Sequence, residues 1–206
     1  MGKEIKQYMD EYFSEMNSLL QEMPKDRIEE VIETLYKAWE KDGQIFIMGN
    51  GGSASTAAHF VCDLVKGTIV EGKKRLRVVS LVDNVPLVSS WTNDSGFGSI
   101  FVEQLKPWLR VGDVLIGISV HGGSGRGEAG PWSENLVKAM NLAKERKAKI
   151  IGFSGFDGGA MKEMADVCIT IPINSEPLGT PLVESFHVAL HHLVCSALKQ
   201  KIENCS

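Results

Sequence analysis

The chain has 206 residues, 43% of them hydrophobic, with 26 acidic against 22 basic side chains and a formal charge of −4. This length suits one ordinary domain, and the near balance of charge, without a dense Lys/Arg tract, excludes nucleic acid as the primary partner. The first residues are polar and no run of ~18 apolar residues occurs, so we expect a cytoplasmic protein with neither a signal peptide nor a membrane span.

Residues 1–42 are predicted to form two helices that belong to the same unit as the rest of the chain. Between residues 3 and 41 there is no glycine and one proline, Pro24, and apolar residues recur at helical spacing. The second helix, from 25 to 41, has a charged and an apolar face. We expect the apolar face to pack on its own domain or on a second subunit.

Residues 43–206 alternate between short apolar strands and helices. The strands are expected at 44–48, 77–82, 114–120, 149–153 and 167–171. The helices are expected at 54–66, 86–92, 100–109, 133–146, 159–164 and 181–201. This alternation is typical of a parallel sheet with helices on both faces. The predicted fold is therefore a doubly wound α/β domain with a helical N-terminal extension.

Three of the predicted strands end in turns rich in glycine and serine, at residues 49–53, 119–124 and 154–159. Ligands of open parallel sheets bind beyond the carboxyl ends of the strands, where glycine amides and serine hydroxyls suit a phosphate monoester. A dinucleotide site is the rival interpretation. The dinucleotide-binding fingerprint, G-x-G-x-x-G or A, would have Ala54 in its last position. The acidic residue at the end of the next strand, Asp83, comes later in the chain than this fingerprint requires. A small phosphorylated ligand is preferred.

Histidines and carboxylates gather on two of the predicted helices. His59 and Asp63 are four residues apart, hence on one helical face. The last helix carries a second group, Glu184, His187, His191 and His192. An i, i+4 pair with two ligands from another helix can form a tetrahedral zinc site, whereas the alternative is partly buried polar residues on amphipathic helices. Helical periodicity aligns Glu184 with His191 better than with His192, but the apolar stripe leaves either histidine at its border.

Three segments resemble the sugar isomerase (SIS) domain family. They are the turn at 49–53 followed by His59, the segment Asn93-Asp94-Ser95-Gly96-Phe97-Gly98, and the stretch from Gly112 to Ser119. The resemblance runs from the N-terminal helices to the last helix and is strongest to the members that isomerise sedoheptulose 7-phosphate. It implies a SIS fold and an enzyme, an aldose–ketose isomerase of phosphorylated sugars.

The resemblance also implies particular site residues. Zinc, one ion per subunit, would be held by His59, Asp63, Glu184 and His192. His192 is preferred to His191 here because the family has two histidines five residues apart, matched by His187 and His192. Asp63 and His192 would transfer protons. The residues that would contact the substrate are Asn50, Gly51, Gly52, Ser53, Asp63, Asn93, Asp94, Ser119, Val120, His121, Glu184 and either Ser124 or Ser133.

The chain departs from the family pattern at three places. Asp63 stands where the family has Glu, which shortens a prospective general base by one methylene. Glu184 replaces a Gln, and the added charge favours a metal. The loop from His121 to Trp132 is expanded, which leaves Ser124 and Ser133 as rivals for the phosphate.

The expected reaction interconverts sedoheptulose 7-phosphate and D-glycero-D-manno-heptose 7-phosphate through an enediolate, which requires a base, an acid and stabilisation of the oxyanion. The family also implies a homotetramer with sites at subunit interfaces. Two alternatives remain open: a non-catalytic sugar-phosphate-binding or replication-regulator-like SIS module, and an isomerase for a different sugar phosphate.

Overall fold

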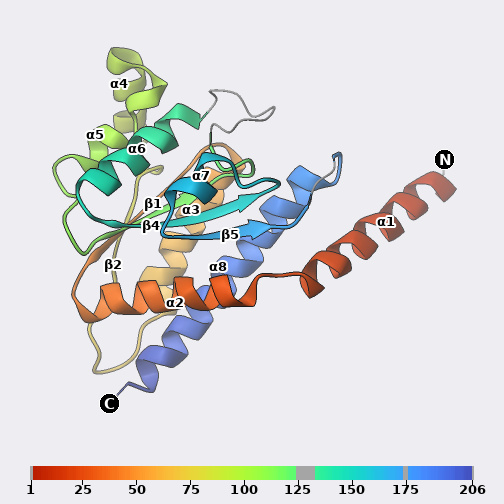
Figure 1. The fold of residues 1–206 in the computed structure, drawn as a ribbon, viewed down its shortest axis with the longest axis horizontal. Helices are drawn as coiled ribbons and strands as arrows, with labels where there is room; N and C mark the ends of the chain where they lie inside the picture. The colour runs from red at the N-terminus through yellow and green to blue at the C-terminus, as the bar shows by residue number, and fades with distance from the viewer. Residues whose placement is uncertain (1, 124–132, 174–175, 206) are drawn as a thin grey trace.

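The fold is seen in a computed structural model that describes residues 2–123, 133–173 and 176–205 (Figure 1). The strands are β1 (Gln44–Gly49), β2 (Arg77–Ser80), β3 (Val114–Ile118), β4 (Lys149–Gly155) and β5 (Val167–Ile171). The helices are α1 (Gly2–Gln21), α2 (Lys25–Glu40), α3 (Gly52–Cys62), α4 (Val85–Ser95), α5 (Val102–Leu105), α6 (Glu134–Glu145), α7 (Gly159–Met164) and α8 (Gly179–Glu203). A π-helical turn, η1 (Asp63–Gly67), continues α3, and a 3₁₀ turn, η2 (Phe97–Ser99), follows α4.

The strands form one parallel sheet in the order β2-β1-β3-β4-β5. Ile45 of β1 is paired with Val78 of β2 on one side and with Val114 of β3 on the other. After β1 the chain adds β2 on one side of it, and then β3, β4 and β5 on the other side. The topological switch point therefore lies between β1 and β3. Ligands of such sheets bind beyond the strand ends at this point. The predicted doubly wound parallel α/β fold is confirmed.

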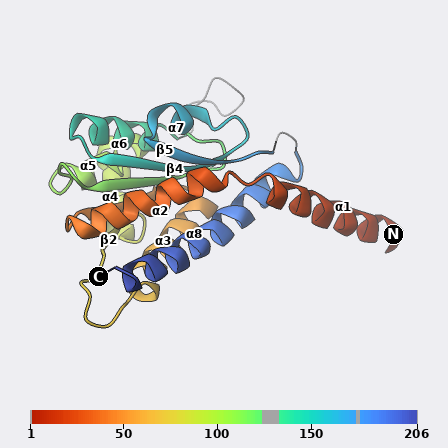
Figure 2. The ribbon, with the colours of Figure 1, turned by 60° about the horizontal axis from the view of Figure 1, so that its bottom comes forward.

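Both faces of the sheet are covered, which explains why the strands are continuous apolar runs (Figure 2). In β1, Ile45 and Ile47 point into a core shared with α2, α3 and α8. Phe46 and Met48 point into a second core, on the side of α5 and α6. All four side chains are fully buried. The helices of the first core include those that carry the candidate metal ligands.

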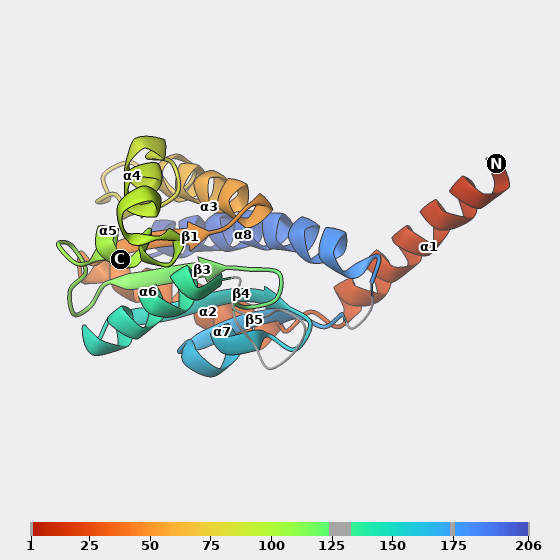
Figure 3. The same cartoon turned by 90° about the horizontal axis from the view of Figure 1, so that it is seen from above.

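Helix α1 projects away from the body of the molecule (Figure 3). Its large apolar side chains Ile5, Met9 and Phe13 are exposed, whereas Leu19, near its end, is buried in the first core. The apolar face of α2 packs on the domain itself, through Val31 and Leu35. None of the helices that the structure describes combines the length and apolarity needed to cross a membrane.

Some element boundaries differ from those expected. The helix expected at 100–109 is confined to α5, because Pro107 has no backbone N–H and its ring excludes a regular helix across that position. The strand expected at 114–120 is shorter in the structure, where β3 ends at Ile118 and the following loop carries Ser119. The helix expected at 54–66 changes its hydrogen-bonding pattern at Asp63, where η1 begins. Such π-helical turns occur frequently at functional sites.

Candidate active site

The turn between β1 and α3 lies at the switch point of the sheet. Gly51 caps α3 with a φ of 57° and a ψ of −125°, a conformation that glycine adopts without strain. Ser53 is buried, while Gly51 and Gly52 are exposed. The first amides of α3 carry the positive end of the helix dipole, so this turn is suited to an anionic group.

Asn50 in this turn is held by Asn135 at the start of α6. The Asn50 Nδ2 donates to Asn135 Oδ1 at 2.9 Å, and the Asn135 Nδ2 donates to Asn50 Oδ1 at 2.8 Å. Asn135 is fully buried, and its Oδ1 also accepts from the Leu136 amide. This reciprocal amide pair ties the turn after β1 to the helix after β3, across the switch point.

Glu184 lies against the first turn of α3. A Cβ added to Gly52 would overlap the Glu184 carboxylate, so the glycine leaves the space that this side chain occupies. Glu184 comes from α8 and is partly buried. The structure thus places a carboxylate beside the helix terminus that would hold a substrate anion.

The ends of β3 and β4 form the neighbouring wall of the site. The Ser119 amide donates to Phe153 O at 3.0 Å, and the Gly155 amide donates to Val120 O at 2.8 Å. The His121 ring is exposed and stacks on Phe156, with ring centroids 4.5 Å apart. These contacts fix the loop after β3 against the loop after β4 at the ligand-binding edge of the sheet.

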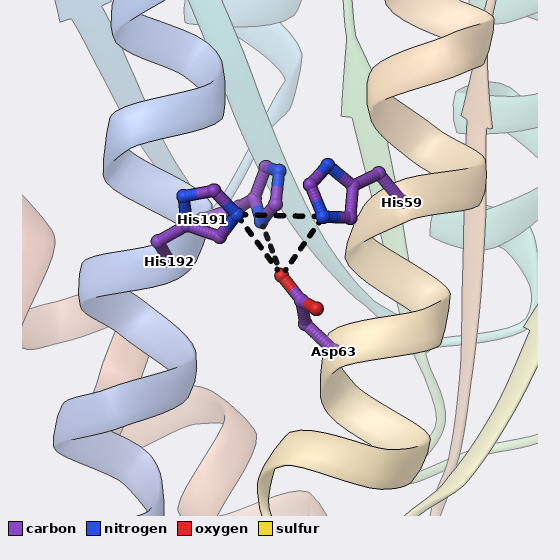
Figure 4. Close-up of side chains that lie close together, drawn as sticks. All are labelled: His59, Asp63, His191 and His192. Atoms are coloured by element: carbon purple, nitrogen blue, oxygen red, sulfur yellow. Dashed lines mark hydrogen bonds and ion pairs between the residues drawn. The ribbon is translucent and has the colours of Figure 1, made fainter.

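Four side chains from α3, η1 and α8 converge between the two long helices (Figure 4). They are His59, Asp63, His191 and His192, whose ligand atoms all lie within 4.8 Å of one another. Asp63 Oδ2 is 3.3 Å from His191 Nδ1, 3.3 Å from His192 Nε2 and 3.6 Å from His59 Nε2. The Nε2 atoms of His59 and His192 are 3.4 Å apart. One carboxylate oxygen therefore faces three imidazoles.

Burial separates the members of this cluster. The His59 and His192 side chains are about half exposed, Asp63 is mostly buried, and the His191 side chain is 1% exposed. Burial, together with the neighbouring His192 and His59, lowers the pKa of His191 to about 4, against the opposing effect of Asp63. His191 is therefore a neutral imidazole at pH 7, the form that binds a metal ion.

The donor set fits a divalent metal ion. Asp63 Oδ2 and both ring nitrogens of His191 are buried without a hydrogen-bond partner, an arrangement that proteins avoid unless something else satisfies these atoms. Imidazole nitrogen and carboxylate oxygen are the ligand types of zinc. The cluster brings together three of the four predicted ligands, His59, Asp63 and His192, and it adds His191.

The other predicted site residues occupy separate positions. Glu184 is not in the cluster of four. Asn93 and Asp94 lie exposed in the last turn of α4, where the Asn93 Nδ2 donates to Asp94 Oδ1 at 2.8 Å. Ser133 is the partly buried N-cap residue of α6, without a side-chain capping bond. Ser124 and the rest of the expanded segment up to Trp132 lie outside the described residues.

Two residues were incompletely identified from the sequence. His191 was one of two candidates on α8, and the structure shows that both histidines reach the same cluster. Asn135 was not among the predicted site residues, and its pairing with Asn50 has no signal in a single sequence. The burial of the Asn135 side chain becomes evident only from the folded structure.

The comparisons with known proteins agree with this geometry. Residues 11–155 match the SIS domain family. The lincomycin biosynthesis protein LmbN of Streptomyces lincolnensis is 46% identical over 89% of this chain, which spans 66% of that relative. The phosphoheptose isomerase of Geotalea daltonii is 34% identical over 98% of this chain and 97% of its own length.

A solved structure extends the similarity to three dimensions. The phosphoheptose isomerase GmhA from Neisseria gonorrhoeae has a TM-score of 0.81 and 27% sequence identity, and the match covers 95% of this chain and 99% of the other. The correspondence is therefore nearly complete in both directions and includes the helices that carry the cluster.

Proposed function

We propose a specific reaction for this chain, which belongs to the SIS domain family and is a phosphosugar isomerase. The reaction is the interconversion of sedoheptulose 7-phosphate and D-glycero-D-manno-heptose 7-phosphate. The observation that carries the proposal is the convergence of Asp63 with three histidines between the helix that begins at the switch point and α8. The non-catalytic alternative is not retained, because the relatives that align over nearly their whole length are isomerases.

The substrate phosphate would be held at the carboxyl edge of the sheet. The amides of Gly51 and Gly52 at the N-terminus of α3 attract an anion, and the hydroxyls of Ser53, Ser119 and Ser133 are hydrogen-bond donors near the strand ends. Glycine amides and hydroxyls suffice without a lysine or arginine. This agrees with the slight negative charge of the chain.

Asp63 and His192 are the groups that would move protons between the two carbons of the substrate. Asp63 Oδ2 faces the histidines, and its second oxygen, Oδ1, is free to take the proton next to the carbonyl (Figure 4). His192, about half exposed, can donate to the carbonyl oxygen. Because Asp is shorter than Glu, the substrate carbon must lie closer to η1 than a glutamate would require.

Zinc is the cofactor we propose for this site, with His59, Asp63 and His192 as three of its ligands. A bound zinc ion polarises a carbonyl oxygen and stabilises the negative charge of an enediolate. The protein's own contribution is to hold the sugar against α3 and to keep the two proton-transfer groups on the same side of it.

A homotetramer with sites at subunit interfaces would account for the projecting helix α1. Its exposed Ile5, Met9 and Phe13 form an apolar surface on a helix that stands clear of the body. Packing such a face against another copy removes it from water. Light scattering at micromolar concentration should give the mass of four chains, and a monomer would contradict this part of the proposal.

Turnover of sedoheptulose 7-phosphate, followed by NMR with zinc supplied, tests the reaction. Asp63→Asn keeps the shape of the side chain and removes the base, so kcat should fall ~10²–10⁴-fold. Glu203→Gln, the same loss of charge at the exposed end of α8, should leave kcat unchanged. Absence of turnover by the wild type, while a known phosphoheptose isomerase works in the same buffer, would refute the proposal.

A second substrate is favoured by one comparison. LmbN, at 46% identity, is more similar to this chain than the phosphoheptose isomerase of Geotalea daltonii at 34%, and it is named for lincomycin biosynthesis. An isomerase for a different sugar phosphate would use the same cluster. Shorter and longer ketose phosphates in the same NMR assay distinguish the two, because the preferred substrate has the highest kcat/KM.

A further inference from the structure

His191 is the member of the cluster that the family resemblance does not assign. Its ring is buried, it stacks on Phe60 with centroids 5.2 Å apart and an interplanar angle of 24°, and neither of its nitrogens has a hydrogen-bond partner. Its Nδ1 points at Asp63 Oδ2 (Figure 4). A polar ring that is held so firmly and left unsatisfied is arranged for a group that the protein itself does not provide.

Four of the six separations within the cluster are close to those of ligands around one ion. With metal–ligand bonds of about 2.0–2.1 Å, tetrahedral donor atoms lie about 3.3–3.4 Å apart. The separations from Asp63 Oδ2 to His191, His192 and His59 are 3.3, 3.3 and 3.6 Å, and that from His59 to His192 is 3.4 Å. The remaining separations stay within 4.8 Å.

Hydrogen bonding within the cluster does not explain this geometry. One carboxylate oxygen faces three ring nitrogens at similar distances, yet Asp63 Oδ2 and His191 Nδ1 make no hydrogen bond. A structural histidine on the same helix behaves differently. The Nε2 of His187 donates to Ser154 O at 3.2 Å. His191 lacks such an acceptor, and a cation at the centre of the cluster would satisfy it.

Glu184 is engaged at another level of the two helices and is not a member of the cluster. It contacts Gly52, which precedes His59 by about two turns, or ~10 Å along the axis of α3. Glu184 likewise precedes His191 by about two turns of α8. Its carboxylate is at the α3 terminus beside the proposed substrate anion, and the fourth position around the cluster is already filled by an imidazole.

We propose that Nδ1 of His191 is the fourth protein ligand of the metal ion, which gives three nitrogens and one oxygen, and that Glu184 is not a ligand but part of the substrate site. The inference rests on the metal site of the proposed function and is independent of which sugar is isomerised. A set rich in imidazole favours zinc, cobalt, nickel and copper over magnesium and manganese.

The test uses cobalt(II) as a spectroscopic probe and competition with a chromophoric chelator for zinc. Metal-free wild-type protein should bind one Co²⁺ per chain with the intense visible absorption of a four-coordinate ion. His191→Leu, which fills the pocket beside Phe60, should lower zinc affinity at least ~100-fold, the upper end of what loss of an outer-shell partner costs. Glu184→Ala, which removes both carboxylate oxygens, should leave affinity and spectrum unchanged. Circular dichroism of the metal-free variants shows whether each is folded.

Cysteine substitutions make the test independent of affinity. His191→Cys should add a near-ultraviolet thiolate-to-cobalt charge-transfer band that the wild type, with its own four cysteines, lacks, whereas Glu184→Cys should not. An unchanged spectrum and affinity in His191→Leu, or a charge-transfer band in Glu184→Cys alone, would overturn the inference. Tetrahedral cobalt that is lost in His191→Leu, in a protein that turns over no phosphosugar, would refute the proposed function and support the inference. Turnover by a wild type whose bound cobalt is unaffected by His191→Leu would support the proposed reaction and overturn the inference.

Discussion

The protein should lose stability in mild acid because of His187. The size of this loss follows from the environment of the His187 ring. Its ring is 1% exposed, Nε2 donates to Ser154 O and Nδ1 has no partner. Burial lowers the pKa of His187 from 6.5 to about 4, although the bond to Ser154 opposes this. Between these pH values the unfolded chain binds a proton that the folded chain excludes. The free energy of unfolding therefore falls as the pH falls from about 6.5 to about 4.

The size of the effect follows from the shift in pKa. Each unit corresponds to about 1.4 kcal/mol, so the shift from 6.5 to about 4 represents about 3 kcal/mol in total. About 2 kcal/mol of this should be lost between pH 7.5 and pH 5. The ring is nearly inaccessible to solvent, so screening by water does not reduce the figure.

Urea unfolding of wild type and His187→Leu at pH 7.5, 6.5 and 5, in the presence of a chelator, measures the difference. The wild type should lose about 2 kcal/mol more than His187→Leu over this range. His191, whose pKa is also lowered to about 4 by burial, is present in both proteins and cancels. Parallel pH dependence of the two proteins would refute the assignment of a neutral, buried His187.

Three further predictions concern the site and the projecting helix. Gly52→Ala should displace the Glu184 carboxylate that its Cβ would overlap and lower kcat/KM for the phosphosugar up to ~100-fold, with an unchanged circular dichroism spectrum. Asn135→Ala leaves Asn50 unpaired at the switch point, so urea unfolding should show a loss of about 1–3 kcal/mol, together with a raised KM. Deletion of residues 2–21 should leave a folded domain of smaller assembly size by light scattering, since α1 projects from the body; a mass equal to that of the full chain would contradict the role given to α1.

The fold was predictable because its signals are local. Continuous apolar runs such as Val114–Ile118 are buried on both faces in the structure, and helical spacing in 25–41 corresponds to the packed face of α2. The errors fall where a single residue changes the local geometry. Pro107 ends a helix that periodicity extends to Leu109, and η1 begins at Asp63 within what is otherwise one helical pattern.

The candidate site was predictable only in part, because side-chain convergence depends on how helices pack. The i, i+4 spacing places His59 and Asp63 on one face, but it does not say which residues of α8 lie opposite them. Periodicity favoured His191 and the family pattern favoured His192, and the packing of α3 on α8 brings both rings to Asp63. Glu184 lies apart from the cluster because its carboxylate contacts Gly52, at the beginning of α3, whereas the cluster lies at the end of α3.

The cluster joins residues that are 133 positions apart in the chain, His59 near the beginning of the domain and His192 in its last helix. During synthesis α8 emerges from the ribosome after the strands and helices that precede it. His59 and Asp63 therefore remain without their partners on α8 until this helix docks, and a chain interrupted before Gly179 lacks two of the four residues of the cluster. Retention of the proposed metal ion would thus report that α8 has docked, because His59 and His192 are brought together only when α8 packs against α3.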